Sequence, residues 1–175
     1  GSLDGESWKL VNYSTTNWSK GAAPLGYSKA GIVTELDYGG DANNKHTTYY
    51  FRKQMSFYQT LHSAVLDSVA DDGFIVYVNG REAGRYNLPS GEVTYSTLAS
   101  TANNNPDKGQ MVLDASLFRK GINTIAVEVH NNNLNSSDIM WDASISYVTE
   151  ADNSYISTDA KYTIGSGVQE INAVF

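Results

Sequence analysis

The sequence predicts an all-β protein, an antiparallel sandwich of two sheets of the jelly-roll type. Segments rich in Val, Ile, Thr and aromatic residues alternate in hydrophobicity with a period of two. Turn signals made of Gly, Pro, Asn and Asp separate these segments at intervals of roughly 8–12 residues, as in β-sandwiches. No segment has the pattern of a long amphipathic helix, and no repeat period is present.

The segment Ala70–Gly80 predicts a turn, a strand and the hairpin turn that follows it. It starts at the turn residues Asp71-Asp72-Gly73 and ends at Asn79-Gly80, a pair typical of tight hairpin turns. Alternation between these turns predicts one strand with two apolar faces. The first face holds Phe74, Val76 and Val78, and the second holds Ile75 and Tyr77.

Before this hairpin, the chain predicts three strands and two loops. We expect a short edge strand at Ser7–Val11, a structured loop at Asn17–Ala30 and an exposed loop at Asp37–Lys45. Thr47–Phe57 is rich in β-forming residues and predicts a strand. Leu61–Val69 predicts the next one, with Leu61, Val65 and Val69 on one face and Ala64 and Leu66 off it.

After the hairpin turn, Arg81–Tyr86 predicts the returning strand. Asn87–Asp107 is rich in Asn, Pro and Gly and predicts one long ordered loop with at most a short strand. Met111–Leu113 predicts a strand. Asp114 can then cap a single helical turn at Ala115–Phe118 that ends at Gly121.

Two further strands complete the predicted sandwich. Thr124–Asn131 directs Ile125, Val127 and Val129 inward, with Glu128 and His130 on the other side. A loop at Asn132–Asp138 separates it from Ile139–Val148. The latter places Ile139, Trp141, Ala143, Ile145 and Tyr147 on one face.

The domain prediction is a β-sandwich module at residues 1–148 and a separate segment at 149–175. The pattern weakens after Val148, where small polar residues precede an apolar end. This segment is either an extension that adds edge strands or the beginning of a neighbouring segment.

Composition and charge exclude several classes of function. The net charge of −7 and the lack of a basic run disfavour binding to nucleic acid or anionic membranes. No apolar run reaches the roughly 18 residues of a membrane span, so we expect no membrane insertion. The chain has no cysteine and 12 tyrosines. Together with its many Asn, Ser and Thr, this favours a secreted or cell-surface bacterial protein.

The order of several motifs resembles a known family. The motifs are Tyr49–Lys53, Asp71–Gly80, Arg85–Pro89, Gly121–His130 and Ser136–Ile139. Together they resemble the galactose-binding-like jelly-roll modules of secreted bacterial proteins, and they are similar to the sugar-binding domain of family 2 glycoside hydrolases. The resemblance covers roughly residues 18–148. It implies a non-catalytic accessory module that binds carbohydrate.

The adjacent carboxylates of Asp71 and Asp72 predict a cation site. Calcium takes six to eight oxygen ligands in irregular geometry, so a loop with Asp71, Asp72 and Asp138 could hold a structural Ca²⁺. The Asp-Asp-Gly sequence also resembles the calcium loop of lectins built on the anthrax protective-antigen adhesin module. The alternative is that these carboxylates accept backbone N–H groups or pair with Arg52 or Arg85.

Aromatic residues in predicted loops suggest a sugar-binding surface, since sugars bind on aromatic faces flanked by polar groups. The predicted ligand contacts are Trp18, Tyr27, Arg85, Tyr86, His130 and Asn132. The alternative for Trp18 and Tyr27 is that they fix their loop to the core. We expect a glycan or a neighbouring domain of the parent protein as the partner.

A hydrolytic site has little support in the sequence. His130, Ser136, Ser137 and Asp138 are close along the chain, but no nucleophile elbow or oxyanion loop accompanies them. The three histidines lack the spacing of zinc ligands. We therefore expect no enzyme activity. A structural or spacer domain that packs on a neighbouring domain without binding sugar is the alternative function.

Overall fold

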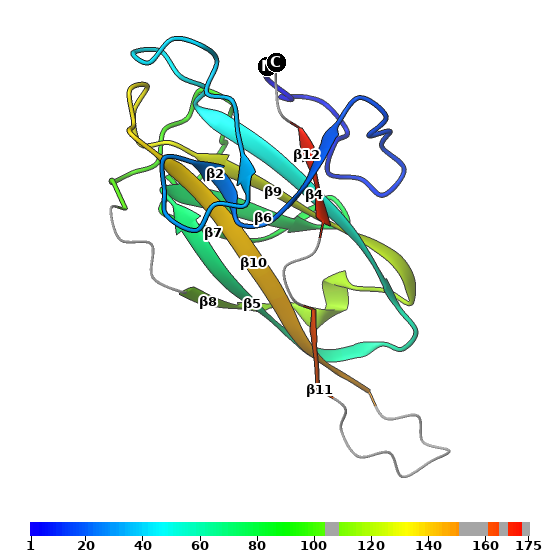
Figure 1. The fold of residues 1–175 in the computed structure, drawn as a ribbon. Coiled ribbons are helices and arrows are strands. Elements are labelled where there is room, and N and C mark those ends of the chain that lie inside the picture. The colour runs from blue at the N-terminus through cyan, green and yellow to red at the C-terminus, as the bar shows by residue number, and fades with distance from the viewer. Residues whose placement is uncertain (104–108, 151–160, 165–167, 173–175) are drawn as a thin grey trace.

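The computed structural model describes residues 1–103, 109–150, 161–164 and 168–172. It confirms the all-β sandwich: two six-stranded sheets pack face to face. In Figure 1, β2, β10 and β5 of one sheet lie in front of β9 and β6 of the other. The helical content of the described residues is a single 3₁₀ turn, Ala115–Leu117. None of their helices has the length and hydrophobicity needed to cross a membrane.

The first sheet, sheet A, has the strand order β1-β12-β4-β9-β6-β7, with every neighbouring pair antiparallel. Its strands are β1 (Ser19–Ala22), β12 (Val168–Asn172), β4 (Thr48–Phe57), β9 (Gly121–His130), β6 (Gly73–Val78) and β7 (Arg81–Tyr86).

The second sheet, sheet B, has the order β3-β2-β10-β5-β8, and β11 also pairs with β10. Its strands are β3 (Thr34–Glu35), β2 (Leu25–Tyr27), β10 (Ile139–Thr149), β5 (Leu61–Asp71), β8 (Gly109–Leu113) and β11 (Lys161–Ile164). All pairs are antiparallel except β2 with β3, which is parallel.

The main hydrophobic core fills the space between the sheets. Phe74 of sheet A meets Trp141 of sheet B with ring centroids 5.1 Å apart. The inward residues of β6 and β9 join this core as the alternation predicted. They are Phe74, Val76, Val78, Ile125, Val127 and Val129.

A second, smaller cluster lies on the outer face of sheet A. It contains the buried residues Trp8, Tyr50, Ile75, Tyr77 and Ala126. The N-terminal segment supplies Trp8 and therefore covers part of this sheet. Because β6 has apolar residues on both faces, all six of its residues are buried.

The hairpin prediction at Asn79-Gly80 is confirmed. Both residues have positive φ, 52° at Asn79 and 87° at Gly80, as a turn of two left-handed residues requires. Val78 and Arg81 are directly paired across it. The strand predictions for β4, β7, β8, β9 and β10 are confirmed within two or three residues at their ends.

The N-terminal predictions are partly wrong. Ser7–Val11 forms turns instead of an edge strand, because Trp8 is drawn onto the outer face of sheet A and is only 2% exposed. The predicted loop Asn17–Ala30 contains β1 and β2. These strands have four and three residues, too few to display a period-two pattern between the Gly and Pro breaks.

The predicted separation of Val65 and Val69 from Ala64 and Leu66 on opposite faces of β5 is confirmed, but the placement of Leu61 with the valines is wrong. Ala64 and Leu66 face the core, and Val65 and Val69 face outward. Leu61 is nevertheless buried, because the pairing of β5 with β10 shifts register near the start of the strand. Leu61 therefore shares the inward face with Ala64 and Leu66 and does not lie on the face of the valines.

Three other predictions concern loops and the chain end. Asp37–Lys45 is a loop of mostly exposed residues, and Asp114 caps the 3₁₀ turn by accepting the N–H of Ser116. Residues 87–103 of the predicted long loop contain no strand, and 104–108 lie outside the described residues. Within 149–175, β11 and β12 pair with β10 and with β1 and β4. The predicted boundary at residue 148 stays a prediction.

Candidate functional site

A pocket of about 330 Å³ lies over the outer face of sheet A. Its floor is formed by Ile75 and Tyr77 of β6 and Glu128 of β9. Glu82 and Arg85 of β7 form one rim. The opposite walls are the N-terminal segment Leu3–Lys9 and the loop Gly91–Thr94.

Strand alternation explains the side chains on the floor. Val76 and Val127 point into the main core, so their neighbours Tyr77 and Glu128 must point outward. The sheet alone would leave Tyr77 and Glu128 in water. The N-terminal segment covers them, and their exposures fall to 7% and 3%.

Trp8 holds the N-terminal wall against the sheet. Its indole packs edge-on against Tyr50, with ring centroids 4.8 Å apart, and against Tyr77 at 5.9 Å. Such aromatic pairs contribute about 0.5–1.5 kcal/mol beyond the area that they bury. The packing places Lys9, the next residue, at the edge of the pocket.

Arg52 fixes the chain that follows Trp8. Its side chain is 1% exposed, and its Nη2 donates to the carbonyl of Leu10 at 2.6 Å. Its Nη1 donates to the carbonyl of Tyr13 at 3.4 Å. The guanidinium also lies over the rings of Tyr13 and Trp18, 5.6 and 5.9 Å from their centroids.

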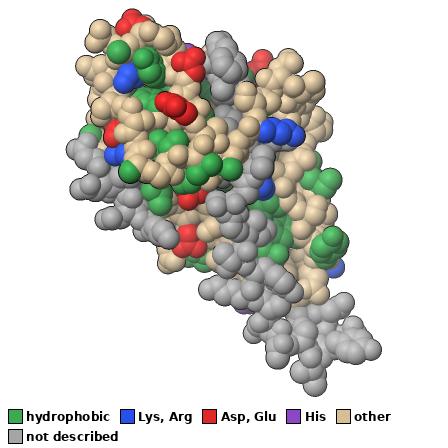
Figure 2. All heavy atoms as spheres, in the orientation of Figure 1, with side chains coloured by type: hydrophobic (Ala, Val, Ile, Leu, Met, Phe, Trp, Pro, Cys, Tyr) green, Lys and Arg blue, Asp and Glu red, His purple; other side chains and the backbone are tan. Residues whose placement is uncertain are grey.

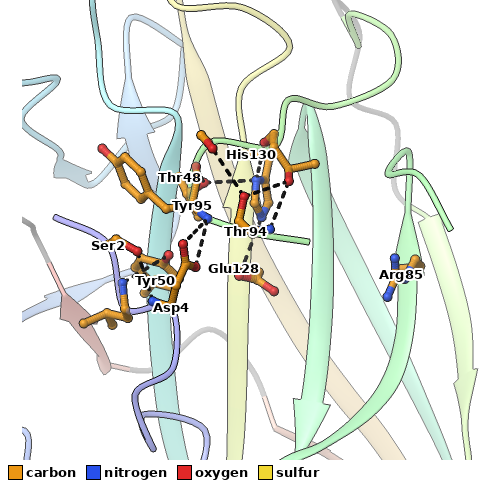
Figure 3. A network of polar contacts seen from close by, with 12 residues as sticks. Ser2, Asp4, Thr48, Tyr50, Arg85, Thr94, Tyr95, Glu128 and His130 are labelled. Atoms are coloured by element: carbon orange, nitrogen blue, oxygen red, sulfur yellow. Dashed lines mark hydrogen bonds and ion pairs between the residues drawn. The ribbon is translucent and has the colours of Figure 1, made fainter. Parts of the chain in front are cut away.

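Asp4 joins the two walls of the pocket. Its carboxylate accepts the backbone N–H of Tyr95, with nitrogen-to-oxygen distances of 2.9 and 3.1 Å. Tyr95 follows the loop Gly91–Thr94. Figure 3 shows Asp4 and Tyr95 on one side of β9, with Arg85 on the other. The walls are therefore held together by a charge-assisted hydrogen bond.

Arg85 holds the loop wall from the opposite rim. Its guanidinium donates twice to Glu82, at 2.6 and 2.7 Å, and also to the carbonyls of Pro89 at 2.5 Å and Gly91 at 3.1 Å. The hydrogen bonds from Arg85 hold the pKa of Glu82 below its usual value. Arg85 was a predicted ligand contact, and the structure places it at the pocket.

The floor contains a buried carboxylate bonded to a phenol. The Tyr77 hydroxyl donates to Oε1 of Glu128. Burial, followed by the negative charge of Glu128, raises the pKa of Tyr77 well above its usual value. Tyr77 therefore remains a hydrogen-bond donor at neutral pH.

His130 lies on the same strand as Glu128, above it in Figure 3, and is fully buried. Its Nδ1 lies 2.7 Å from the carbonyl of Thr97, which can only accept, so Nδ1 bears the proton. Thr48 Oγ1 is 3.0 Å from the same nitrogen and donates its own proton to the carbonyl of Tyr95. His130 Nε2 lies 3.7 Å from Oε2 of Glu128.

The pocket is acidic. The described residues that line it contain five carboxylates and two cationic side chains. The carboxylates belong to Asp4, Glu6, Glu82, Glu92 and Glu128, and the cations are Lys9 and Arg85. The pocket therefore combines the aromatic rings of Trp8 and Tyr77 with an excess of negative charge.

Other predicted ligand residues lie away from this pocket's lining. Tyr27 is 2% exposed and packs edge-on against Tyr38, while Trp18 packs edge-on against Tyr13 at 6.1 Å. Tyr27 therefore takes the alternative role, fixing its segment to the core. His130 has no exposed surface to offer a ligand.

Tyr86 and Asn132 also lie outside the lining. Tyr86 is 49% exposed at the end of β7, and its ring lies 6.0 Å from Phe74. Asn132 is partly buried, and its backbone N–H donates to Asp72. A contact between these residues and a glycan stays a prediction.

The predicted calcium ligands Asp71 and Asp138 share a cation that the chain itself supplies. The Lys29 ammonium lies 2.8 Å from a carboxylate oxygen of each. Burial would lower the pKa of Lys29, but hydrogen bonds to Asp138 and Asp71 outweigh it and raise that pKa. A calcium ion between these two carboxylates would have to displace Lys29.

The third predicted calcium ligand, Asp72, binds backbone. Its Oδ1 accepts the N–H of Asn103 at 2.6 Å and its Oδ2 accepts the N–H of Asn132 at 2.8 Å. This is the alternative role considered for the Asp pair. Within the described ranges, no group of three or more His, Asp or Glu side chains is arranged to hold a metal.

The residues considered for hydrolysis are also bonded elsewhere. Ser136 donates to the carbonyl of Asp138 at 3.1 Å, and Ser137 donates to its carboxylate at 2.9 Å. His130 bonds to Thr97 and Thr48 instead. These contacts do not form the hydrogen-bonded chain of nucleophile, base and orienting acid that a triad needs.

Comparison with solved structures finds parts of glycoside hydrolases. An α-L-rhamnosidase from Aspergillus terreus matches 75% of this chain and 15% of its own, with a TM-score of 0.51 and 16% identity. An α-L-rhamnosidase from Streptomyces avermitilis, complexed with L-rhamnose, matches 93% of this chain and 12% of its own, with a TM-score of 0.46 and 20% identity. A β-glucuronidase from Ruminococcus gnavus matches 75% of this chain and 31% of its own, with a TM-score of 0.33 and 11% identity. No family model and no curated protein sequence matches the chain.

The likeness to the Aspergillus enzyme supports the sandwich fold. The chain spans less than a third of the length of the solved chains that it resembles.

Sequence reasoning missed most of the pocket. Glu128 was correctly placed on the outer face of its strand, and Tyr77 was correctly placed on the face opposite Val76, but nothing local signals that the N-terminal segment covers them. One signal was available: a strand with apolar residues on both faces must be covered on both. Ile75 and Tyr77 on the second face of β6 therefore implied a covering segment.

Proposed function

We propose that this chain is a non-catalytic carbohydrate-binding module of a secreted or cell-surface protein, and that the pocket over sheet A is its binding site. The observation that supports the proposal best is the pairing of Tyr77 with the buried Glu128 on the pocket floor. Carboxylates accept hydrogen bonds from sugar hydroxyls, and rings offer apolar faces to the C–H groups of a sugar.

The architecture of the pocket also supports binding. Its floor lies on two neighbouring strands of sheet A, and both walls are held by hydrogen bonds that Arg52 and Arg85 donate and Asp4 accepts. A rigid site loses little freedom when a ligand binds, which favours affinity. The resemblance to a small part of longer glycoside hydrolases supports an accessory role.

Binding would be tested by calorimetric titration of the chain with a panel of soluble oligosaccharides. Glu128→Gln keeps the shape of the pocket floor and removes its charge. Asp67→Asn is the matched control, because it removes one carboxylate from the outer face of sheet B, where Asp67 pairs with Gln110.

The proposal expects a glycan that binds the wild type and the Asp67→Asn variant equally and the Glu128→Gln variant about tenfold more weakly. Equal binding by all three proteins would exclude this pocket as the site. A panel without any binding would reject carbohydrate binding altogether.

A second candidate function is packing on a neighbouring domain. A groove of about 340 Å³ on sheet B is lined by residues of β5, β8 and β10, including Val65 and Val148. Val112 of β8 is 79% exposed. Figure 2 shows the molecule from the side on which β10 lies in front, with hydrophobic and acidic side chains close together. The occupant would be another domain of a longer chain; the Aspergillus enzyme, of which 15% is matched, is such a longer chain.

Hydrogen exchange would test this second function. If β8 packs on an adjoining domain, its amides exchange more slowly in a longer natural chain than in this one. Unchanged exchange at Val112 and its neighbours in both chains would reject the packing.

A further inference from the structure

We propose that the pocket over sheet A recognises a sugar bearing a free ammonium group, and that the Lys9 side chain occupies the ammonium position when no ligand is bound. The inference rests on the proposed carbohydrate binding and names the class of sugar. Three features of the pocket lead to it: its charge, the position of Lys9 and the contacts of Glu128.

The charge of the pocket favours a cation. Arg85 is bonded to Glu82 by two hydrogen bonds, so this pair is close to neutral. The other lining residues with charge are Lys9 and four carboxylates, those of Asp4, Glu6, Glu92 and Glu128. Carboxylates in excess attract an ammonium group and repel sulfated or uronic acid sugars.

The ammonium group of Lys9 already occupies this site. Its ammonium lies 4.0 Å from the centroid of the Tyr77 ring and 5.3 Å from that of Trp8. Both distances are within the range of cation–π attraction, about 6 Å. The charge of Lys9 also contributes to the lowered pKa of Glu82. A positive group is therefore held between the aromatic faces and the acidic rim.

Glu128 provides a second contact for an ammonium group. It is 97% buried, as its exposure of 3% shows, and its Oε1 accepts from Tyr77. Oε2 lies 3.7 Å from His130 Nε2, beyond hydrogen-bond distance. Because Glu128 lines the pocket, Oε2 is the carboxylate oxygen left to accept a hydrogen bond from a ligand there.

The same ligand group can satisfy both features. An ammonium carries three donors, so it can bond to Oε2 of Glu128 while its charge faces the Tyr77 ring. Lys9 sits on a long flexible stem at the rim and can swing away. An amino sugar would replace the Lys9 ammonium with its own, and the cost of displacing Lys9 weakens the apparent affinity.

The test compares glucosamine oligosaccharides, whose amines are free, with their fully N-acetylated counterparts at pH 6. Titration calorimetry would be run on the wild type, Lys9→Met, Glu128→Gln and the control Asp67→Asn. Thermal melts would verify that each variant is folded. Lys9→Met retains a long apolar stem against Tyr77 and removes only the competing charge.

The inference expects the free-amine oligosaccharide to bind the wild type more tightly than the acetylated one. Lys9→Met should bind the free amine about fivefold more tightly, since the competing cation–π contact is gone. Glu128→Gln should bind it about tenfold more weakly, and Asp67→Asn should equal the wild type. Added salt should weaken free-amine binding by screening.

Equal affinity for both oligosaccharides in the wild type would overturn ammonium recognition and leave carbohydrate binding intact. Weaker binding of the free amine by Lys9→Met would overturn the displacement of Lys9. If neither glucosamine oligosaccharide binds but other sugars bind and Glu128→Gln weakens them, the proposed class of sugar is wrong and carbohydrate binding at this pocket stands. If no sugar binds, the proposed function fails first.

Discussion

The amide side chains of Asn79 and Asn123, which are 44 residues apart, bond to each other at 2.7 Å between Nδ2 of Asn79 and Oδ1 of Asn123. Asn79 lies in the turn after β6, and Asn123 lies near the start of β9. Asn123 also accepts the N–H of Arg119 at 2.9 Å and donates to the carbonyls of Arg119 and Gly121 at 2.7 and 2.9 Å. The pair joins the hairpin turn to the turn that starts the neighbouring strand.

Replacing Asn123 with Ala should destabilise the fold by about 3 kcal/mol, because Asn123 is fully buried and its four hydrogen bonds to Asn79, Arg119 and Gly121 are lost. Urea unfolding measures this change. Asn43→Ala is the control in the exposed loop Asp37–Lys45, and its effect should stay within about 0.5 kcal/mol. Similar midpoints for the two variants would show that the Asn123 bonds contribute little.

Asn79 contributes both side-chain hydrogen bonds and a left-handed backbone conformation, and two substitutions can separate these contributions. Its side chain accepts the N–H of Thr124 at 3.0 Å and donates to the carbonyl of Leu117 at 2.9 Å, and its φ is 52°. Asn79→Gly loses the hydrogen bonds and tolerates the left-handed backbone. Asn79→Ala loses both advantages and should be about 1 kcal/mol less stable than the Gly variant. Equal stability of the two variants would indicate that the turn relaxes away from this backbone conformation.

Asp71 should make stability depend on pH near neutrality. Burial raises its pKa to about 7 from the usual 3.8, although hydrogen bonding to Lys29 opposes this. Between these pH values the folded protein holds a proton that the unfolded chain has released, so stability falls as pH rises through the window. The slope is at most about 1.4 kcal/mol per pH unit for one proton.

Urea unfolding between about pH 4 and pH 8 would measure that slope. Asp71→Asn cannot ionise and should remove this contribution, while Asp67→Asn should retain it. A wild-type slope that survives in Asp71→Asn would assign the effect to another group.

Calcium should not raise the melting temperature of the wild type, because the Lys29 ammonium lies between Asp71 and Asp138. Melting curves with calcium and with a chelator test this. In Lys29→Met the two carboxylates lose their cation, so this variant should be less stable and its calcium response should exceed that of the wild type. A calcium-dependent rise in the wild type that Asp138→Asn abolishes would instead support the predicted calcium site.

The strands of the sandwich were predictable where the hydrophobic pattern is long. β9 and β10 have ten and eleven residues, and Val127 and Trp141 face the core as their alternation requires. β1 and β2 were missed because strands of four and three residues have too little pattern to read. In β5, apolar residues on both faces made the inward side ambiguous.

The pocket was less predictable than the fold, because residues distant in sequence create it. Asp4 meets the backbone of Tyr95 across 91 residues, and the Trp8 ring meets Tyr77. No local pattern predicts such contacts. Arg85 was predicted as a ligand contact, but its bonds to Glu82 and Gly91 could be known only from the folded chain.

Arg52 should control the order of the N-terminal wall and, through it, the pocket. Its guanidinium bonds to the carbonyls of Leu10 and Tyr13, in turns where the N–H of Tyr13 itself bonds to Leu10. Arg52→Met retains a stem of similar length and loses both bonds. Global stability should fall by only about 1–2 kcal/mol, since water can reach the exposed Leu10 and desolvation of the charge is relieved.

The local effect should be larger than the global one. Hydrogen exchange at the amides of Leu10 and Tyr13 should accelerate in Arg52→Met well beyond the change at β9. Gln54→Ala is the control. Gln54 lies on the same face of β4 as Arg52 and donates to the carbonyl of Val11 at 3.0 Å, but this bond is exposed, so its loss should have a smaller effect. If exchange at Leu10 and Tyr13 accelerates no more than at β9, the wall does not depend on Arg52. Loss of sugar binding in Arg52→Met with β9 protection unchanged would link the N-terminal wall directly to the pocket.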